Sequence, residues 1–249
     1  MIKNKIVVGI LPTYNLTNED NNPYDDRATF VRMYEEMVTK NGAIAIGLLN
    51  NNIEIYKDIC DAYIWPGGSC IQKDFYIIFD DVIKNHKPLL GICLGFQAIC
   101  TYFNILEDQK NEKNLSIIET YNKNKETNPY LIRLDENELK IHSNYVTKDQ
   151  ESIEKAKHKI IINKNTFMYD IYKKESIKVP SMHGFKPPRL SKELIISAIA
   201  EDNIVEAVEY HKNNSKILGV HYHPELIKDN AIFKWLIDNA KDNQKKNQN

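Results

Sequence analysis

The sequence Pro88-Leu-Leu-Gly-Ile-Cys93-Leu-Gly95-Phe-Gln97 is the main basis for predicting the fold of this chain. An apolar run ends at a cysteine, and the residues after the cysteine follow an amphipathic helical pattern. This order is typical of a buried parallel strand that leads into a helix. Cys93 lies at the turn, where a nucleophile is held in a tight backbone conformation and nearby glycines let neighbouring elements approach closely.

The position of Cys93 suits a nucleophile. A helix N-terminus stabilises a thiolate and aims backbone N–H groups at an oxyanion beside the sulfur. The alternative is a buried structural cysteine, since a free cysteine packs as a small hydrophobic residue. A second motif, Gly219-Val-His221-Tyr-His223-Pro224-Glu225, favours catalysis because it supplies a base. Its carboxylate, Glu225, follows His223 by two residues and can orient the imidazole ring.

The same motif also permits a metal-binding interpretation. His221 and His223 are two residues apart on a predicted strand, so their side chains share a face. The pair is a weak ligand signal, and no third ligand follows at a recognisable spacing. The sequence therefore predicts no metal and no other cofactor. Four further histidines lie in polar surroundings without an acid or cysteine partner in register, and they are predicted to be surface residues: His86, His142, His158 and His211.

The two motifs together resemble the class I glutamine amidotransferase family. Within it, the chain is most similar to the free-standing γ-glutamyl hydrolase branch, peptidase C26, which includes γ-glutamyl-γ-aminobutyrate hydrolases. Asp61-Ala-Tyr-Ile-Trp-Pro66-Gly67-Gly68-Ser69 resembles the family's oxyanion strand. Val179-Pro-Ser181-Met-His183-Gly184-Phe185 resembles its Val-Asn-Ser-x-His segment, with Pro180 in place of Asn. The four segments occur in the family's order, and the similarity extends over nearly the whole chain.

The resemblance implies a set of site residues. Cys93 would attack the amide carbonyl of a glutamine-like substrate, with His223 as its base and Glu225 orienting His223. Glu225 also suits a simpler role as the acidic residue at a helix N-terminus. The oxyanion would be bound by backbone N–H groups, and the glutamyl end by a second group of residues. The expected oxyanion donors are Leu94 and Gly67 or Gly68, and the expected substrate-binding residues are Gln97, Ser181, His183, Gly184 and Phe185.

The leaving group is less well defined, because the chain departs from the hydrolase branch. Leu94 follows the nucleophile where the branch often has Arg, and residues 101–106 run directly into a polar region. We expect a hydrolase that cleaves a γ-glutamyl amide through a thioester and releases glutamate and an amine. A glutaminase subunit that sends ammonia to a separate synthetase is the alternative, favoured by Leu94 and by residues 183–185. A non-catalytic binding protein on the same fold is disfavoured, since every residue that the chemistry needs is present.

Strand-like and helical patterns alternate along the chain. Strands are predicted at residues 5–11, 43–48, 62–65 and 88–92, and helices near residues 26–40, 73–85 and 94–103. This alternation predicts an α/β fold, a flavodoxin-like and mostly parallel sheet with helices on both faces and ligands at the carboxyl ends of the strands. Further strands are predicted at residues 158–162, 177–180, 194–200 and 204–210, and a final helix at residues 230–240.

The predicted domain organisation is simple. One domain spans residues 1–240, with a polar insertion at residues 106–144 and a polar tail at residues 241–249 that is expected to fray. Long polar runs are usually solvated loops. The resemblance places this insertion near the mouth of the active site, where it could also serve as a lid or a partner-binding surface.

Composition excludes several classes of partner. The net charge is -1, with 33 Lys and Arg against 34 Asp and Glu, so no strong field attracts nucleic acid or an anionic membrane. No stretch approaches the ~20 apolar residues of a membrane span, and the first apolar run is too short for a signal peptide. The four cysteines, Cys60, Cys70, Cys93 and Cys100, lack CxxC spacing and are expected to be reduced. We therefore expect a cytoplasmic enzyme with a small-molecule substrate, compatible with a homodimer or a separate synthetase partner.

Overall fold

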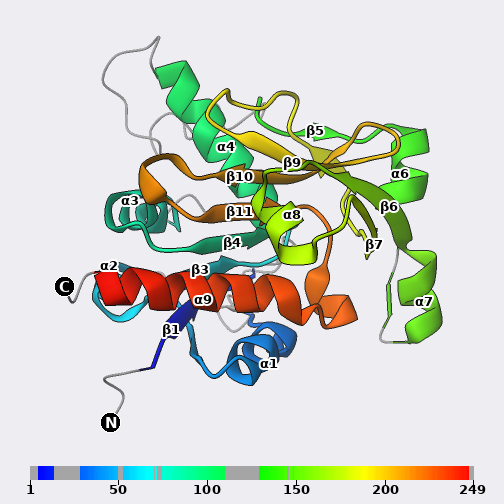
Figure 1. Ribbon diagram of the computed structural model, residues 1–249. Helices are drawn as coiled ribbons and strands as arrows, with labels where there is room; N and C mark the ends of the chain where they lie inside the picture. The colour runs from blue at the N-terminus through cyan, green and yellow to red at the C-terminus, as the bar shows by residue number, and fades with distance from the viewer. Residues whose placement is uncertain are drawn as a thin grey trace, which may run out of the picture.

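The computed structural model describes residues 5–13, 29–49, 53–69, 71, 75–109, 129–144, 146–147 and 149–246. Within these residues, a nine-stranded sheet has the order β2-β1-β3-β4-β11-β10-β9-β6-β7, and β5 pairs separately with β8 (Figure 1). The strands are β1 (Val7–Ile10), β2 (Ile44–Gly47), β3 (Ala62–Trp65), β4 (Leu89–Ile92), β5 (Ile132–Arg133), β6 (Lys157–Ile162), β7 (Ser176–Pro180), β8 (Phe185–Lys186), β9 (Ile195–Ala200), β10 (Val205–Tyr210) and β11 (Ile217–Val220).

Helices cover both faces of the sheet. The α-helices are α1 (Arg32–Lys40), α2 (Ile53–Ile59), α3 (Tyr76–Asn85), α4 (Leu94–Gln109), α6 (Glu136–His142), α7 (Gln150–Lys155), α8 (Phe167–Tyr172) and α9 (Asn230–Lys246), and the 3-10 helices are η3 (Lys212–Asn214) and η4 (Pro224–Ile227). Buried residues of α1, α8 and α9 share one hydrophobic core, and those of α2, α3 and α4 share the other. In Figure 1, α9 crosses the face that α1 and α8 also cover. The predicted α/β fold with helices on both faces is confirmed.

The parallel half of the sheet brings the sequence motifs to one edge. Strands β2, β1, β3, β4 and β11 are neighbours and run parallel. β3, β4 and β11 are buried along their whole length, as expected of apolar strands covered on both faces. Because parallel strands share a direction, the turns after Trp65, Ile92 and Val220 lie at the same edge. The remaining strands, β10, β9, β6 and β7, extend the sheet in antiparallel pairs.

Several elements differ from the sequence-based expectation. The helix after Cys93 continues to Gln109, and α2 and α8 were not anticipated. Part of the predicted polar insertion is regular structure, because Asp135 and Glu138 form a capping box that begins α6. Residues 110–128 of that insertion lie outside the described residues. The final helix continues through Lys246, past residue 240 where we expected it to end, since no Gly or Pro interrupts residues 241–246.

The described residues bear on two expectations, one about membrane-spanning segments and one about the cysteines. None of the helices found there is long and apolar enough to cross a lipid bilayer. Cys60, Cys93 and Cys100 are free thiols with buried side chains. Cys70 lies outside the described residues.

Glycine at position 95 allows β3 and α4 to pack in direct backbone contact. A Cβ atom at Gly95 would lie 2.0 Å from the carbonyl oxygen of Trp65, closer than any real contact. A Cβ atom at Gly91 would in turn lie 2.7 Å from the backbone of Gly95. The glycines on either side of Cys93 are therefore needed because strand and helix approach closely here.

We expect Gly95→Ala to lower the free energy of unfolding by about 3 kcal/mol, because the new methyl group must displace the backbone of Trp65. Gly184→Ala is the matched control, since the nearest atom to its added Cβ is Leu139 Cδ2 at 3.8 Å. That variant should stay within about 0.5 kcal/mol of the wild type. Chemical denaturation measures both changes, and equal effects of the two substitutions would contradict this account of Gly95.

Candidate active site

Cys93 occupies a strained turn between β4 and α4. Its φ of 51° lies in the left-handed region, which is uncommon and costly for a residue with a side chain. Two backbone hydrogen bonds hold the turn: the Cys93 N–H donates to the Val220 carbonyl at 2.8 Å, and the Gln97 N–H donates to the Cys93 carbonyl at 3.1 Å. The result is a strand–turn–helix unit with a cysteine at its apex, the geometry of a nucleophile elbow.

The side chains of His223 and Glu225 lie at the same site as the turn of Cys93. The His223 backbone N–H donates to the carbonyl of Pro180 at the end of β7, at 2.9 Å. Nδ1 of His223 lies 2.6 Å from Oε1 of Glu225, and both side chains are buried. A Cβ atom at Gly67 would lie 2.9 Å from Cε1 of His223 and 3.4 Å from Cβ of Cys93, so Gly67 leaves room for both side chains.

Tyr34 extends this chain of contacts and was not identified from the sequence. Its hydroxyl donates to Oε1 of Glu225 at 2.9 Å, the same oxygen that contacts His223. Burial and the Glu225 carboxylate raise the pKa of Tyr34 well above its ordinary value, so the hydroxyl keeps its proton and remains a donor. In sequence, Tyr34 has the same spacing as the core residues Met37 and Val38 of α1, so no pattern distinguishes it from a packing residue.

The electrostatics of His223 depend on its neighbours Glu225 and Cys93. Burial alone would lower the pKa of His223, but the Glu225 carboxylate and the Cys93 sulfur outweigh it and raise that pKa well above its ordinary value. These neighbours therefore favour the protonated form of the ring. An imidazolium beside a cysteine favours the thiolate, which is the nucleophilic form of the side chain. This arrangement can perform nucleophilic attack followed by proton donation.

The predicted oxyanion donors lie next to Cys93. Leu94 is the first residue of α4, where backbone N–H groups lack helical partners. A Cβ atom at Gly68 would lie 3.2 Å from Cδ2 of Leu94, so these two residues are neighbours. The backbone of Gly67 acts on the Tyr34 hydroxyl, where it lowers the pKa against the larger effects of burial and Glu225. Which of Gly67 and Gly68 donates to an oxyanion together with Leu94 stays a prediction.

The predicted substrate-binding residues are partly engaged with one another. Nε2 of Gln97 lies 3.3 Å from the Phe185 carbonyl and 3.1 Å from Nε2 of His221. Ser181 is buried, and its hydroxyl has no hydrogen-bond partner within the described part of the chain. The Gly184 carbonyl accepts a hydrogen bond from Leu134 at 2.9 Å, and the Phe185 ring is about half exposed. Their role in binding substrate stays a prediction.

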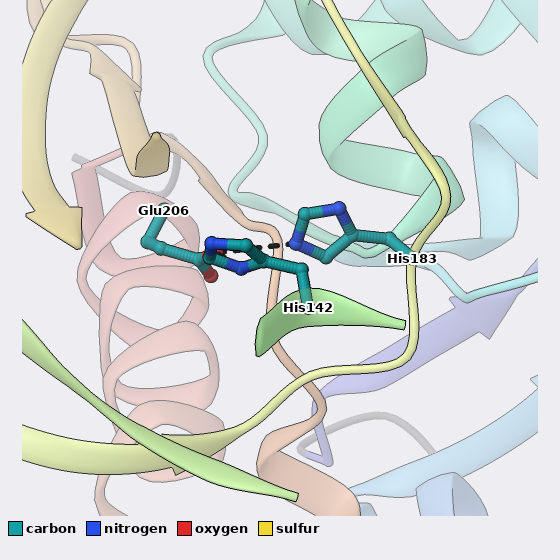
Figure 2. Close-up of side chains that lie close together, drawn as sticks. All are labelled: His142, His183 and Glu206. Atoms are coloured by element: carbon teal, nitrogen blue, oxygen red, sulfur yellow. Dashed lines mark hydrogen bonds and ion pairs between the residues drawn. The ribbon is translucent and has the colours of Figure 1, made fainter. Parts of the chain in front are cut away.

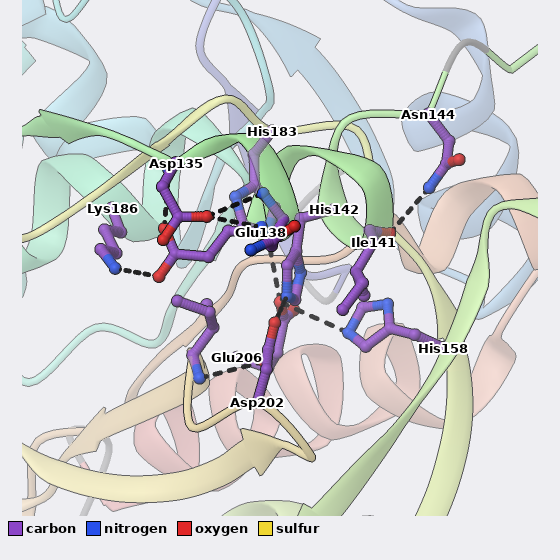
Figure 3. Close-up of polar contacts among 12 residues, drawn as sticks. Asp135, Glu138, Ile141, His142, Asn144, His158, His183, Lys186, Asp202 and Glu206 are labelled. Carbon is purple, nitrogen blue, oxygen red and sulfur yellow. Dashed lines mark hydrogen bonds and ion pairs between the residues drawn. The ribbon is translucent and has the colours of Figure 1, made fainter.

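The assignment of His142 to the surface was wrong. His142 is the last residue of α6, and its side chain is completely buried together with those of His183 and Glu206 (Figure 2). His158, also expected at the surface, is mostly buried and reaches the same carboxylate from β6 (Figure 3). No sequence pattern could indicate this arrangement, because its members come from four separate parts of the chain. We call His142, His158, His183 and Glu206 the histidine cluster.

Charge in the histidine cluster is concentrated on Glu206. Burial would raise the pKa of Glu206, but the three surrounding rings outweigh burial and hold that pKa well below its ordinary value. Burial lowers the pKa of His183 despite the nearby Glu206 carboxylate. For His142, burial is outweighed by the carboxylates of Glu206 and Asp202, which raise its pKa. The cluster therefore places an ionised carboxylate among imidazole rings in a buried environment.

Sequence comparisons identify related proteins over most of the chain. A family profile described as Peptidase C26 matches residues 72–225. A glutamine amidotransferase-like protein of Rickettsia prowazekii is 27% identical over 96% of this chain and 99% of its own length. The CTP synthase of Thermosipho africanus is 29% identical over 78% of this chain, but the match covers only 38% of that enzyme.

Solved structures share the fold. A protein of Thermoplasma acidophilum, described as a subunit of GMP synthase, has a TM-score of 0.65 and 14% identity, with 98% of each chain covered. The glutaminase domain of Trypanosoma brucei CTPS with bound acivicin has a TM-score of 0.63 and 16% identity, covering 95% of this chain and 94% of that domain. At these identities the similarity is evidence of the fold alone.

We expect iodoacetamide at neutral pH to alkylate Cys93 before Cys60 or Cys100. Burial raises the pKa of Cys60 to about 12 and also raises that of Cys100, so both remain unreactive thiols. His223→Asn should slow alkylation of Cys93 at least about tenfold, because it removes the cation beside the sulfur. His211→Asn, at an exposed histidine, is the control. Peptide mapping by mass spectrometry measures each rate, and equal rates in the two variants would contradict the proposed pairing.

Proposed function

Because this chain belongs to the peptidase C26 family, we propose that it is a cysteine-dependent hydrolase of γ-glutamyl amides. One observation carries the proposal: Cys93, in a left-handed turn at a helix N-terminus, lies beside a buried His223 that is oriented by Glu225. A nucleophile, a base and a group that orients the base are the parts that acyl transfer through a covalent intermediate requires.

In the first half of the reaction, the Cys93 thiolate attacks the side-chain carbonyl carbon of the γ-glutamyl group. A C–S bond forms, and the carbonyl electron pair moves to oxygen. Backbone N–H groups of Leu94 and of Gly67 or Gly68 stabilise this oxyanion, a contact worth ~3 kcal/mol per donor. His223 then gives its proton to the departing nitrogen, the C–N bond breaks, and a γ-glutamyl thioester and a free amine result.

In the second half, neutral His223 takes a proton from water, and the oxygen attacks the thioester carbonyl. The C–S bond breaks with its electron pair on sulfur, glutamate forms, and His223 is again protonated beside a thiolate. Glu225 keeps the proton on Nδ1, so that Nε2 serves the reacting atoms in both halves. Tyr34 holds the Glu225 oxygen that makes this contact.

The glutamyl end of the substrate would lie near Gln97, Ser181 and residues 183–185, next to Cys93. The leaving amine distinguishes two functions that share all of these steps. In a free-standing hydrolase the amine carries a substituent, whereas in a glutaminase subunit it is ammonia for a separate synthetase. The sequence similarity to CTP synthase supports this second candidate.

The deciding experiment is glutamate release by the purified chain, with glutamine and a panel of γ-glutamyl amines. We expect release from at least one γ-glutamyl amine, and a loss of at least about a thousandfold in Cys93→Ala, because the covalent pathway is removed. Cys100→Ala, which changes another buried cysteine, should match the wild type. Activity retained in Cys93→Ala would overturn the mechanism. Release from glutamine alone, or only with a partner chain, would make the protein a glutaminase subunit.

We expect Tyr34→Phe to lower kcat/KM about tenfold, since a hydrogen bond to a charged group is worth ~1.5 kcal/mol. Tyr56→Phe, on α2, is the matched control, because its hydroxyl accepts a hydrogen bond from the exposed Leu49 backbone N–H at 3.3 Å. Steady-state kinetics on the best substrate measure both variants. An unchanged kcat/KM in Tyr34→Phe would show that Glu225 orients His223 without help from the tyrosine.

A further inference from the structure

The histidine cluster lies apart from the Cys93, His223 and Glu225 set and has no role in the acyl-transfer steps. Its ring nitrogens converge on one oxygen, Oε1 of Glu206, at 2.9 Å from Nδ1 of His142, 3.1 Å from Nε2 of His183 and 3.5 Å from Nε2 of His158. Figures 2 and 3 show the rings arranged around this carboxylate. Such convergence of imidazole and carboxylate groups in a buried place requires an explanation, because polar burial without satisfied partners is costly.

Hydrogen bonding within the described residues does not satisfy the histidine cluster. Nδ1 of His142, both ring nitrogens of His158 and Oε2 of Glu206 are buried without a hydrogen bond of acceptable geometry. Nδ1 of His142 is thus close to Oε1 of Glu206 but is not directed toward it. In native proteins nearly all buried polar atoms have a partner, and exceptions commonly mark an ion or a water molecule.

The distances match those between the ligands of a bound ion. Zinc binds imidazole nitrogen and carboxylate oxygen at ~2.0–2.2 Å, so neighbouring ligand atoms of a tetrahedral site lie about 3.3 Å apart. The three distances to Oε1 of Glu206, which are 2.9, 3.1 and 3.5 Å, lie on either side of that value. The ligand atoms of His142, His183 and Glu206 all lie within 4.8 Å of one another. Nδ1 of His142 makes no hydrogen bond, whereas Nε2 of His183 is hydrogen-bonded to Oε1 of Glu206, a contact that a bound ion would replace.

The rings of His142 and His183 are oriented as metal ligands require, because in each ring the nitrogen that faces away from Glu206 contacts an oxygen acceptor. Nε2 of His142 lies 2.9 Å from the Asp202 carboxylate, and Nδ1 of His183 lies 3.2 Å from the Phe185 carbonyl. A proton on each of these outer nitrogens leaves the inner nitrogens, Nδ1 of His142 and Nε2 of His183, free to donate a lone pair. Metal-binding histidines almost always give their second N–H to a carboxylate or a backbone carbonyl in this way.

We propose that His142, His183 and Glu206 form a binding site for a divalent transition-metal ion, with zinc as the best match. The ligand set of two imidazoles and a carboxylate suits zinc, and His158 lies beside it on the same carboxylate oxygen. A divalent cation balances the two negative charges of Glu206 and Asp202 when the rings are neutral. The proposal shares His183 with the predicted glutamyl-binding segment but does not depend on the acyl-transfer mechanism, since Cys93, His223 and Glu225 are not ligands.

The bound ion would connect three parts of the chain and lie next to a fourth. His142 ends α6, His158 belongs to β6, Glu206 belongs to β10, and His183 lies in the segment between β7 and β8. The ring of His183 also stacks on His221 with centroids 3.4 Å apart, two residues before His223. An ion held here would therefore fix residues 181–185 against the sheet beside the candidate active site.

The test uses the full chain, stripped with a chelator, loaded with Zn²⁺ and dialysed. Elemental analysis should find one zinc per chain in the wild type and less than about a tenth of that in His142→Gln and Glu206→Gln. Asp202→Asn should weaken zinc binding about 10- to 100-fold by removing an outer contact. Two controls should keep the zinc: His211→Gln, at an exposed histidine, and Cys93→Ala, which removes a thiol that could bind metal in its own right.

A second measurement needs no variant and so does not depend on whether His142→Gln folds. Co²⁺ added to the stripped wild type should give the visible absorption of a four-coordinate site without a thiolate charge-transfer band, and Zn²⁺ should abolish it. Zinc below a tenth of an equivalent in the loaded wild type would overturn the proposal. Loss of zinc in Cys93→Ala, or a thiolate band with cobalt, would assign the metal to the cysteine and would equally overturn it.

Discussion

The left-handed backbone of Cys93 governs the geometry of the whole candidate active site. It is held between the Val220 carbonyl on one side and the first turn of α4 on the other. The turn is this sharp because α4 packs onto β3 at Gly95 with no space for a side chain. Strain at one residue is thereby maintained by contacts of the whole parallel half of the sheet, as is usual for strained functional residues.

A single carboxylate oxygen links that turn to a helix on the other face of the sheet. Oε1 of Glu225 contacts both His223 and Tyr34, and Tyr34 belongs to α1, which packs on the face opposite to α4. The orientation of the base is therefore coupled to the packing of a core helix. Because these groups are buried, their interactions are stronger than they would be in water.

In the antiparallel half of the sheet, the carboxylate of Glu206 likewise links side chains from separate parts of the chain. It gathers His142, His158 and His183 from three other elements, and its charge offsets part of the cost of burying these rings. Stacking of His183 on His221 brings this polar centre into contact with the segment that carries His223. The two centres share no side chain, but they hold neighbouring segments of the chain in place.

The amino-acid sequence alone was enough to predict the parallel strands, the α/β class and the motifs around Cys93, His223 and Gly68. These features are local: an apolar run of strand length, a helical period and glycines at turns follow from residues close together in the chain. The same patterns could not indicate Tyr34, whose spacing is that of a packing residue, nor the burial of His142, whose partners lie far along the chain. Both emerge only from the folded structure, because which polar side chains meet in a buried place depends on how separate elements pack and not on the pattern within any one of them.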